Sequence, residues 1–341
     1  MKNHKIVIVI IALCLFSIVA GLYGKNINTQ KAKATQDEST MSLFSDGDKI
    51  ALINIDGPIQ FESSDSLFGP KTSAENARVS LKKILKDDSV KGVLLRINSP
   101  GGTVGMSQEV YSDVLKVRAV KPVVVSMVDM AASGGYYISA AADRIYAYPG
   151  TLTGSIGVIL NTYDAGELLT KKLGVKPEII KSGKFKDIAS PYRSMTKEER
   201  QLLQNMTDST HEQFINAVIV ARSNRNDKYK VKKQILDAKI LREHADGRIF
   251  NGEQALQIGL VDSIGTLADA HDAVSDMAKE KFGIKSKNSI PLVNYNAPTG
   301  FNEIFCGAKS QLGKFGITGD ISEKLMPFSA KHPNQPLIIW E

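Results

Sequence analysis

The chain of 341 residues has little of what marks a disulfide-stabilised or metal-binding protein. Its only two cysteines, Cys14 and Cys306, lie far apart in sequence, so no disulfide framework is implied. The five histidines are scattered, and no group of cysteines and histidines has the spacing of metal ligands. The sequence therefore predicts a protein that uses neither a metal nor another cofactor.

The chain also lacks long blocks of like charge, although its formal net charge is +7. Lysines and arginines are mixed with acids throughout, and no basic stripe is interleaved with aromatic residues. Because nucleic-acid binding needs a concentrated basic surface, we expect no nucleic-acid partner. A solvated basic surface is the plainer interpretation, and attraction to an anionic membrane surface is the alternative.

One long apolar run is present at the N-terminus. Residues 6–23 form an uncharged run of 18 residues after the short basic segment 1–5. As a helix this run reaches about 27 Å, close to the thickness of a bilayer's hydrocarbon core. We expect residues 1–24 to be a transmembrane anchor; a cleaved signal sequence is the alternative, since Val19-Ala20-Gly21 is a weak cleavage site. Residues 25–47 are polar and predict a flexible tether to an exported domain.

From residue 48 onward, apolar strands alternate with amphipathic helices. The patterns predict strands over 49–55, 93–97, 122–128 and 144–147, with helices over 74–86, 107–117 and 133–142. Strand–helix–strand units repeated in this way indicate an α/β fold with a mostly parallel sheet covered by helices. We expect this domain to span residues 48–285, with a helix and turn over 247–269. The segment 286–341 is expected to be a loosely ordered tail.

A long helix is predicted to begin at Thr196 and to run towards Arg222. Thr196 and Glu199 have the spacing of a capping box, which satisfies backbone N–H groups at a helix start. One face of this helix is apolar and should pack on the sheet domain or on a neighbouring subunit. Its residues are Leu202, Leu203, Met206, Phe214 and Val218.

Two glycine-containing turns follow predicted strands, at 98–103 and at 131–135, and the second contains Ser133. Glycines let the backbone bend sharply and present its N–H groups to a ligand. A serine between a strand and a helix lies at a helix N-terminus, which favours the anionic intermediate of a nucleophilic serine. The same turn also fits an ordinary helix cap, so both interpretations stay open at this point.

A nucleophilic serine needs a base, and no histidine lies near either turn. A lysine can serve when burial lowers its pKa from about 10.4 towards neutrality. Candidates lie in segment 179–187, where apolar residues alternate with Lys181, Lys184 and Lys186. Taken alone, each of these lysines also fits a solvated surface charge.

Four motifs occur in order along the chain: SPGG at 99–102, MAASGGYYISAAADRIYA at 130–147, TGSIGV at 153–158 and SGKFKD at 182–187. With their order and intervals, the chain resembles the bacterial signal peptide peptidase A family over residues 49–270. The later segments 246–248 (DGR) and 259–262 (GLVD) fit the same family. This resemblance implies a Ser–Lys peptidase on the fold shared by the Clp protease proteolytic subunit and the crotonases, built from repeated ββα units.

The resemblance also implies roles by position. Ser133 matches the nucleophile, and Lys186 matches the general base, with Lys184 as the alternative in the same short segment. Ser155 resembles the serine that orients the lysine amine.

The backbone N–H groups of Gly102 and Gly134 match the oxyanion hole, and Gly101 shapes the turn. These roles imply a single-pass, membrane-anchored serine endopeptidase that degrades remnant signal peptides and other unfolded peptides. The catalytic domain is expected on the extracytoplasmic side of the cytoplasmic membrane, in a ring-like or dome-like homo-oligomer.

Two other functions fit the same fold. A crotonase-like acyl-CoA enzyme would share the oxyanion glycines but would need no nucleophile at Ser133. An inactive membrane scaffold would keep the fold and lose the chemistry, which the presence of both a serine and a candidate lysine disfavours.

Overall fold

The computed structural model of the protein describes residues 47–61, 72–223, 236–296 and 337–339. The predicted anchor (1–24) and the predicted tether (25–47), apart from its last residue, lie outside these ranges. No helix within the described ranges is both long and apolar enough to cross a bilayer.

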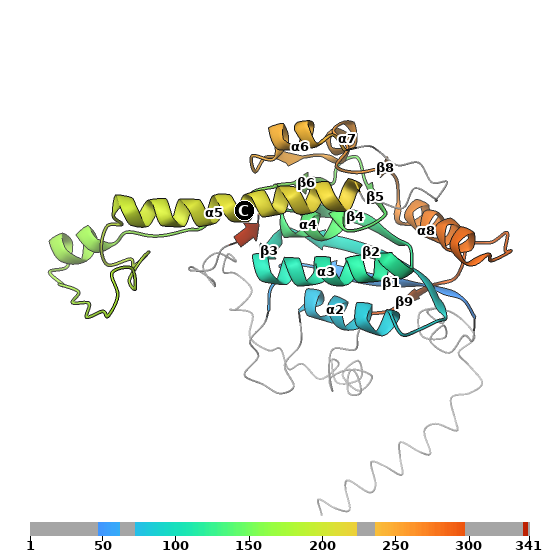
Figure 1. Ribbon diagram of the computed structural model, residues 1–341, viewed down its shortest axis with the longest axis horizontal. Coiled ribbons are helices and arrows are strands. Elements are labelled where there is room, and N and C mark those ends of the chain that lie inside the picture. The colour runs from blue at the N-terminus through green and yellow to red at the C-terminus, as the bar shows by residue number, and fades with distance from the viewer. Residues whose placement is uncertain (1–46, 62–71, 224–235, 297–336, 340–341) are drawn as a thin grey trace, which may run out of the picture. The chain divides into compact units, whose positions relative to one another are not determined.

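The strands and helices follow one another largely as the sequence patterns predict (Figure 1). The strands are β1 (Lys49–Asp56), β2 (Val90–Ser99), β3 (Gly101–Thr103), β4 (Val123–Ala132), β5 (Arg144–Ala147), β6 (Leu152–Gly154), β7 (Ile249–Phe250), β8 (Ser263–Ile264), β9 (Leu292–Asn294) and β10 (Leu337–Ile339). The helices are α2 (Ser73–Ile84), α3 (Val104–Val120), α4 (Gly134–Ala140), the π-helix η2 (Leu168–Lys172), α5 (Lys197–Ser223), α6 (Ala238–His244), α7 (Gly252–Gln257) and α8 (Leu267–Phe282).

Eight of the described strands form one sheet in the order β7-β6-β4-β2-β1-β9, with β5 pairing with both β4 and β8. Every pair in this sheet is parallel except β6 with β7. The predicted α/β fold with a mostly parallel sheet is therefore confirmed. Outside the sheet, β10 pairs antiparallel with β3, placing Ile338 opposite Gly102.

Helices cover both faces of the sheet because the central strands are apolar on both sides. In β1, Ala51, Ile53 and Ile55 pack into the larger hydrophobic cluster together with residues of α2, α3 and α4. Ile50 points to the opposite face and packs into a second cluster with residues of α8. The alternation follows from the period of two along a strand and gives three layers, with helices on either side of the sheet.

The sheet and the helices that cover it are hereafter called the body. Helix α5 packs on the body through its C-terminal half. Phe214 and Val218 are buried, and Phe214 contacts the ring of Tyr137 in α4 with 4.9 Å between centroids. The end of the helix is fixed by Arg222, whose Nη1 lies 2.9 Å from the buried Asp262 carboxylate. Leu202 and Met206, in the N-terminal half, stay 44% and 47% exposed. The predicted apolar face therefore packs on the body along only half of its length.

Two features differ from the sequence-based expectations in extent. The region 247–269, expected to hold one helix and a turn, contains β7, α7, β8 and the start of a further helix, α8. Strand β9 lies within the segment expected to be a loose tail, where it pairs in parallel with β1. Tyr295 then donates a hydrogen bond to Asp87. For residues 297–336, outside the described ranges, the expectation of loose order stays a prediction.

Candidate active site

Ser133 lies at the sharp turn between β4 and α4. Its φ of 52° and ψ of −115° are unfavourable for a residue with a side chain, and such strain costs about 1–3 kcal/mol and is concentrated at functional sites. The turn is held by two backbone hydrogen bonds, from Ser133 N to Gly154 O (2.9 Å) and from Tyr137 N to Ser133 O (2.8 Å). This is the strand–turn–helix geometry that presents a nucleophilic serine in hydrolases.

The Ser133 hydroxyl does not act as a helix cap. It makes no capping hydrogen bond to the start of α4, and its Oγ is buried without any hydrogen-bond partner among the described residues. A buried, unpaired hydroxyl costs free energy, so its retention needs a reason outside local stability. The ordinary-cap interpretation of Ser133 is therefore wrong, and the alternative of a reactive hydroxyl remains.

The two glycine turns meet beside Ser133. A Cβ placed on Gly134 would lie 2.4 Å from Ser107 Oγ and 3.2 Å from Gly102 N, so the two glycine backbones are in direct contact. A Cβ on Gly102 would lie 2.0 Å from Ile59 O, and Gly101 has a φ of 104°. Only glycine fits these positions. The structure thus brings together Ser133 and the backbones of Gly101, Gly102 and Gly134.

Ser155 also belongs to this group. In the register of β4 and β6, Ala132 pairs with Gly154, so Ser133 and Ser155 each follow a residue of the same pair. Ser155 is buried, has a φ of 50°, and donates its backbone N–H to Arg248 O (2.8 Å). Two serines with positive φ therefore lie side by side at the ends of neighbouring strands.

The glycine contact yields a prediction for Gly134→Ala. The new methyl group would push Ser107 Oγ, which is held by Thr103 O at 2.9 Å, or shift the Gly102 amide. If the Gly102 amide is an oxyanion donor, as the motif resemblance implies, displacing it should lower kcat by about 100-fold with a smaller change in KM. Peptide hydrolysis by purified protein measures both. The control is Gly105→Ala in the first turn of α3, where a Cβ meets nothing within 4 Å; equal activity of the two variants would contradict the assignment.

Lys186 lies elsewhere in the same chain. It belongs to residues 159–206, hereafter the arm, which comprise η2, the following loop and the exposed start of α5. Figure 1 shows the loop that precedes α5, drawn in yellow-green, at the end of α5 that lies farthest from the sheet. Lys186 lines a cavity of about 540 Å³ within the arm, next to Leu160, Leu203 and Met206. The structure does not bring Lys186 or Lys184 to the Ser133 of its own chain.

The lysines of the arm differ in their partners. Lys181 pairs with Asp187, and Lys184 pairs with Glu198. Among the described residues, Lys186 has no side-chain ion pair, and its backbone N–H donates to Gly183 O at 3.1 Å. Of the two candidate bases, Lys186 is thus the one whose amine is not already engaged.

The arm carries an unusual amount of exposed apolar surface. Ile180 is 96% exposed, and Tyr163, Leu168, Leu173, Val175 and Tyr192 are each more than half exposed. Large apolar side chains that are exposed together in one segment favour a contact with another molecule. The arm thus has the character of an interface.

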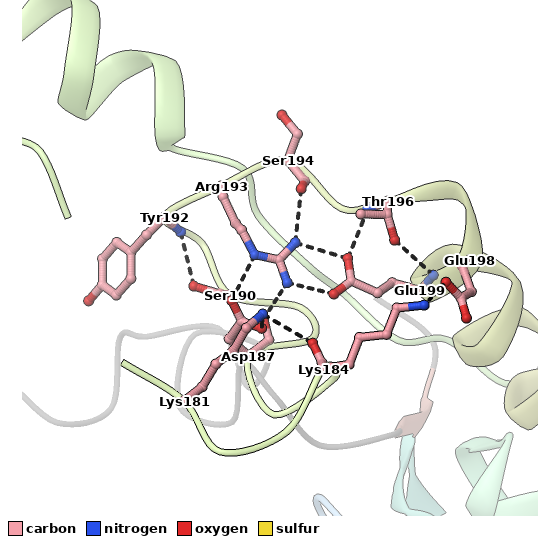
Figure 2. Close-up of polar contacts among 10 residues, drawn as sticks. All are labelled: Lys181, Lys184, Asp187, Ser190, Tyr192, Arg193, Ser194, Thr196, Glu198 and Glu199. Atoms are coloured by element: carbon pink, nitrogen blue, oxygen red, sulfur yellow. Dashed lines mark hydrogen bonds and ion pairs between the residues drawn. The ribbon is translucent and has the colours of Figure 1, made fainter. Parts of the chain in front are cut away.

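A polar network in the arm was not predicted from the sequence. Arg193 lies between Asp187 and Glu199 and contacts both carboxylates (Figure 2). The sequence did identify Glu199 through its capping box, which the structure confirms: Thr196 N donates to Glu199 Oε2 (2.8 Å), and Glu199 N donates to Thr196 Oγ1 (3.2 Å). Arg193 itself has no periodic or motif signal, because its partners are set by the path of a loop.

Within the described residues, no group of three or more histidine, cysteine, aspartate and glutamate side chains could hold a metal ion. The groups that the structure places at Ser133 are its hydroxyl and the backbones of Gly101, Gly102 and Gly134. Such a site can attack a carbonyl carbon and hold the resulting oxyanion once a base is supplied.

Comparison with known proteins identifies the class. The profile of peptidase family S49 matches residues 116–281, and that of the Clp protease matches residues 70–152. "Putative signal peptide peptidase SppA" of Enterococcus faecium is 36% identical over 80% of this chain and 74% of the relative. Two further relatives are "Protease 4" of Salmonella typhi (35%; 76% and 39%) and "Serine protease SPPA, chloroplastic" of Arabidopsis thaliana (30%; 80% and 38%).

Together with the fold and the serine turn, these matches define a serine peptidase with a Clp protease-like α/β fold. The resemblance to signal peptide peptidase A found in the motifs is confirmed. The chain belongs to peptidase family S49.

Proposed function

We propose that the protein is a membrane-anchored endopeptidase that degrades remnant signal peptides, with Ser133 as nucleophile and Lys186 as general base. The observation that carries the proposal is the buried, unpartnered Ser133 Oγ beside the backbones of Gly102 and Gly134. The substrate class is supported by the name of the Enterococcus faecium relative. Other unfolded or membrane-released peptides are included in the proposed substrates.

The choice of Lys186 over Lys184 rests on charge pairing. A base must present a neutral amine to the serine, and an amine held by a carboxylate stays protonated. Lys184 is paired with Glu198, whereas Lys186 has no such partner among the described residues and faces a partly apolar cavity.

Lys186 is proposed to reach the Ser133 of a neighbouring copy. Two observations support this arrangement: the arm projects from the body that holds Ser133, and its apolar side chains are exposed. A closed homo-oligomer, in which each arm contacts the next copy, would bury that surface and complete every site. This arrangement also gives the apolar start of α5 the neighbouring subunit that the sequence pattern allowed.

The proposed reaction uses only groups of the chain and one water molecule. Neutral Lys186 takes the Ser133 proton while Oγ attacks the peptide carbonyl carbon, and Ser155 orients the amine. The Gly102 and Gly134 N–H groups hold the oxyanion, and Gly101 shapes their turn. The lysine ammonium then protonates the leaving amine. Water hydrolyses the acyl-enzyme with the same groups in reversed roles.

The edge of β3 supports an extended peptide as the substrate. Thr103 N and Gly101 O both bond to Ile59, so the polar groups of Gly102 face the opposite edge of the strand. Along that edge the chain's own segment Leu337–Ile339 pairs antiparallel with β3. An extended peptide can be bound in this way through main-chain hydrogen bonds.

The membrane anchor, single-pass topology and extracytoplasmic location remain part of the proposal. They rest on the uncharged run over residues 6–23 and on the polar segment 25–47 that follows it. In this scheme residues 48–285 form the peptidase domain and residues 286–341 the tail, which adds strand β9 to the sheet of the domain.

A serine-directed fluorophosphonate tests the proposal. The full-length protein should form one covalent adduct, mapped to Ser133 by mass spectrometry, because labelling needs the activated hydroxyl. Ser139→Ala is a matched control, since Ser139 lies in α4 and its Oγ donates to Gly135 O at 2.7 Å. That variant should label normally. Absence of an adduct would favour a crotonase-like enzyme, and labelling without hydrolysis of an apolar signal-peptide sequence would contradict the proposed substrate.

A further inference from the structure

Asp187 follows Lys186 directly in the sequence and belongs to the polar network in the arm (Figure 2). The Asp187 side chain is only 10% exposed although the loop around it lies at the surface. Its Oδ2 accepts a hydrogen bond from Arg193 Nε at 2.8 Å, and its Oδ1 contacts Lys181 Nζ. The residue next to the proposed base is therefore held from two sides.

Arg193 uses all of its N–H groups in this network. Nε donates to Asp187 Oδ2, and the two terminal nitrogens contact Glu199 Oε2 at 2.9 Å and Oε1 at 2.5 Å. The remaining donors reach the backbone oxygens of Ser194 (3.1 Å) and Asp187 (3.4 Å). A planar guanidinium can join two carboxylates along different edges, whereas a lysine ammonium cannot keep this geometry.

Glu199 connects the network to a rigid element. Its side chain is 3% exposed, it lies in the first turn of α5, and it also accepts the Thr196 N–H of the capping box. Helix α5 is in turn fixed to the body through Phe214 and Arg222. A continuous chain of contacts thus runs from the body along α5 through Glu199, Arg193 and Asp187 to Lys186.

From this arrangement we infer that Arg193 is a positioning residue for catalysis, which clamps the Lys186 loop to the start of α5 so that the amine reaches Ser133. The inference rests on the proposed role of Lys186 as the base. Arg193 contacts two carboxylates and no reacting atom. Its function is to keep the base in one geometry while the arm lies against the neighbouring copy, because catalysis falls steeply when a reacting group is misplaced.

The clamp consists of Arg193, Asp187 and Glu199, and its two carboxylates are ionised. Hydrogen bonds from Arg193 and Lys181 hold the pKa of Asp187 well below its usual range, and hydrogen bonds from Arg193 and Thr196 lower the pKa of Glu199 to about 2. Carboxylates with a depressed folded-state pKa stabilise the fold above their unfolded pKa, and this contribution is lost only as the pH falls through the folded value. The carboxylates of Asp187 and Glu199 therefore remain charged above their depressed pKa values.

Arg193, Asp187 and Glu199 form the clamp, with Lys181 as a further contact of Asp187, while Lys184 and Glu198 form an exposed pair beside it. When Arg193 is removed, the two carboxylates lose the group that joins them, and the Lys186 loop loses its attachment to the start of α5. A clamp variant should therefore lower kcat more than it changes KM.

The test compares Arg193→Gln with Arg242→Gln in the full-length protein. Arg242 also donates hydrogen bonds to a carboxylate of α5, that of Glu212, at 2.9 Å and 3.0 Å. Arg242 does not belong to the network that holds the Lys186 loop. For Arg193→Gln we expect kcat to fall by roughly 100-fold and KM to change less. Arg193→Lys should recover little activity, and Arg242→Gln should behave like the unmodified protein.

Three outcomes overturn or support the inference. Equal kcat for Arg193→Gln and Arg242→Gln would overturn it, and a much lower kcat for Arg193→Gln with little recovery in Arg193→Lys would support it. If Arg193→Gln fails to fold, Asp187→Asn replaces it and should show the same loss of kcat in a folded protein; unchanged kcat would overturn the inference. Lys186→Ala is measured in parallel. If Lys186→Ala is active, the proposed role of Lys186 as the base is wrong. If Lys186→Ala is inactive and Arg193→Gln has normal activity, only the positioning role of Arg193 is wrong.

Discussion

Ser133→Ala and Lys186→Ala should each reduce peptide hydrolysis by about a millionfold, to the level set by the oxyanion hole and substrate binding. In the proposed mechanism Ser133 supplies the attacking oxygen, and without a base its hydroxyl is a weak nucleophile. Both variants should fold normally, because the Ser133 Oγ makes no hydrogen bond to other described residues and Lys186 lies on the exposed arm. Hydrolysis of a fluorogenic apolar peptide, with circular dichroism on the same samples, measures both properties.

Two matched variants control this experiment. Lys184→Ala removes a lysine two positions away that is paired with the exposed Glu198, and it should keep most of the activity. Ser139→Ala removes a buried hydroxyl from α4 and should also stay active. An active Lys186→Ala together with an inactive Lys184→Ala would transfer the role of base to Lys184. If both lysine variants were active, the Ser–Lys mechanism would be wrong.

Mixing the two inactive variants should restore activity. If each site combines Ser133 of one copy with Lys186 of the next, random assembly of equal amounts leaves about a quarter of the sites with both groups intact. Ser133→Ala and Lys186→Ala proteins are mixed, dissociated and reassembled, and the recovered activity is compared with that of the unmodified protein. The expected result is an increase from almost nothing to about one quarter.

The control for this experiment pairs Ser133→Ala with the double variant Ser133→Ala/Lys186→Ala. No combination of these two chains contains an intact serine, so this mixture must stay inactive. Failure of the first mixture to recover activity, while it forms the same oligomer as the unmodified protein, would show that serine and base come from one chain. The arm would then have to fold back onto the body that carries it.

The sequence predicted the parts of the molecule that depend on local pattern. Strands β1 and β4 and helix α5 were recognised from their apolar periodicity, and the capping box marked the start of α5 correctly. The order of the motifs also predicted that Ser133 lies beside the glycine turns. These features depend on residues that are neighbours along the chain or that recur at fixed intervals.

Other features depend on the path of the chain through space, and the sequence did not predict them. The start of α8 was placed in a helix-and-turn region, because its buried face consists largely of small residues such as Ala270, Ala273 and Ala278. The role of Arg193 was missed, since Asp187 and Glu199 become its partners only through a loop. The distance between the arm and Ser133 within one chain also has no signature in the motifs that contain them.

Because Ser133 and Lys186 are separated within one chain, association of copies would control whether the enzyme is active. A single copy would carry a nucleophile without a base and a base without a nucleophile, and would be harmless to other proteins while it is made and exported. Hydrolysis would begin only when copies associate. The rate of hydrolysis would therefore increase more steeply than in direct proportion to the local concentration of the protein. A tether that confines copies to a surface would raise that concentration, and dilution into detergent would switch the enzyme off.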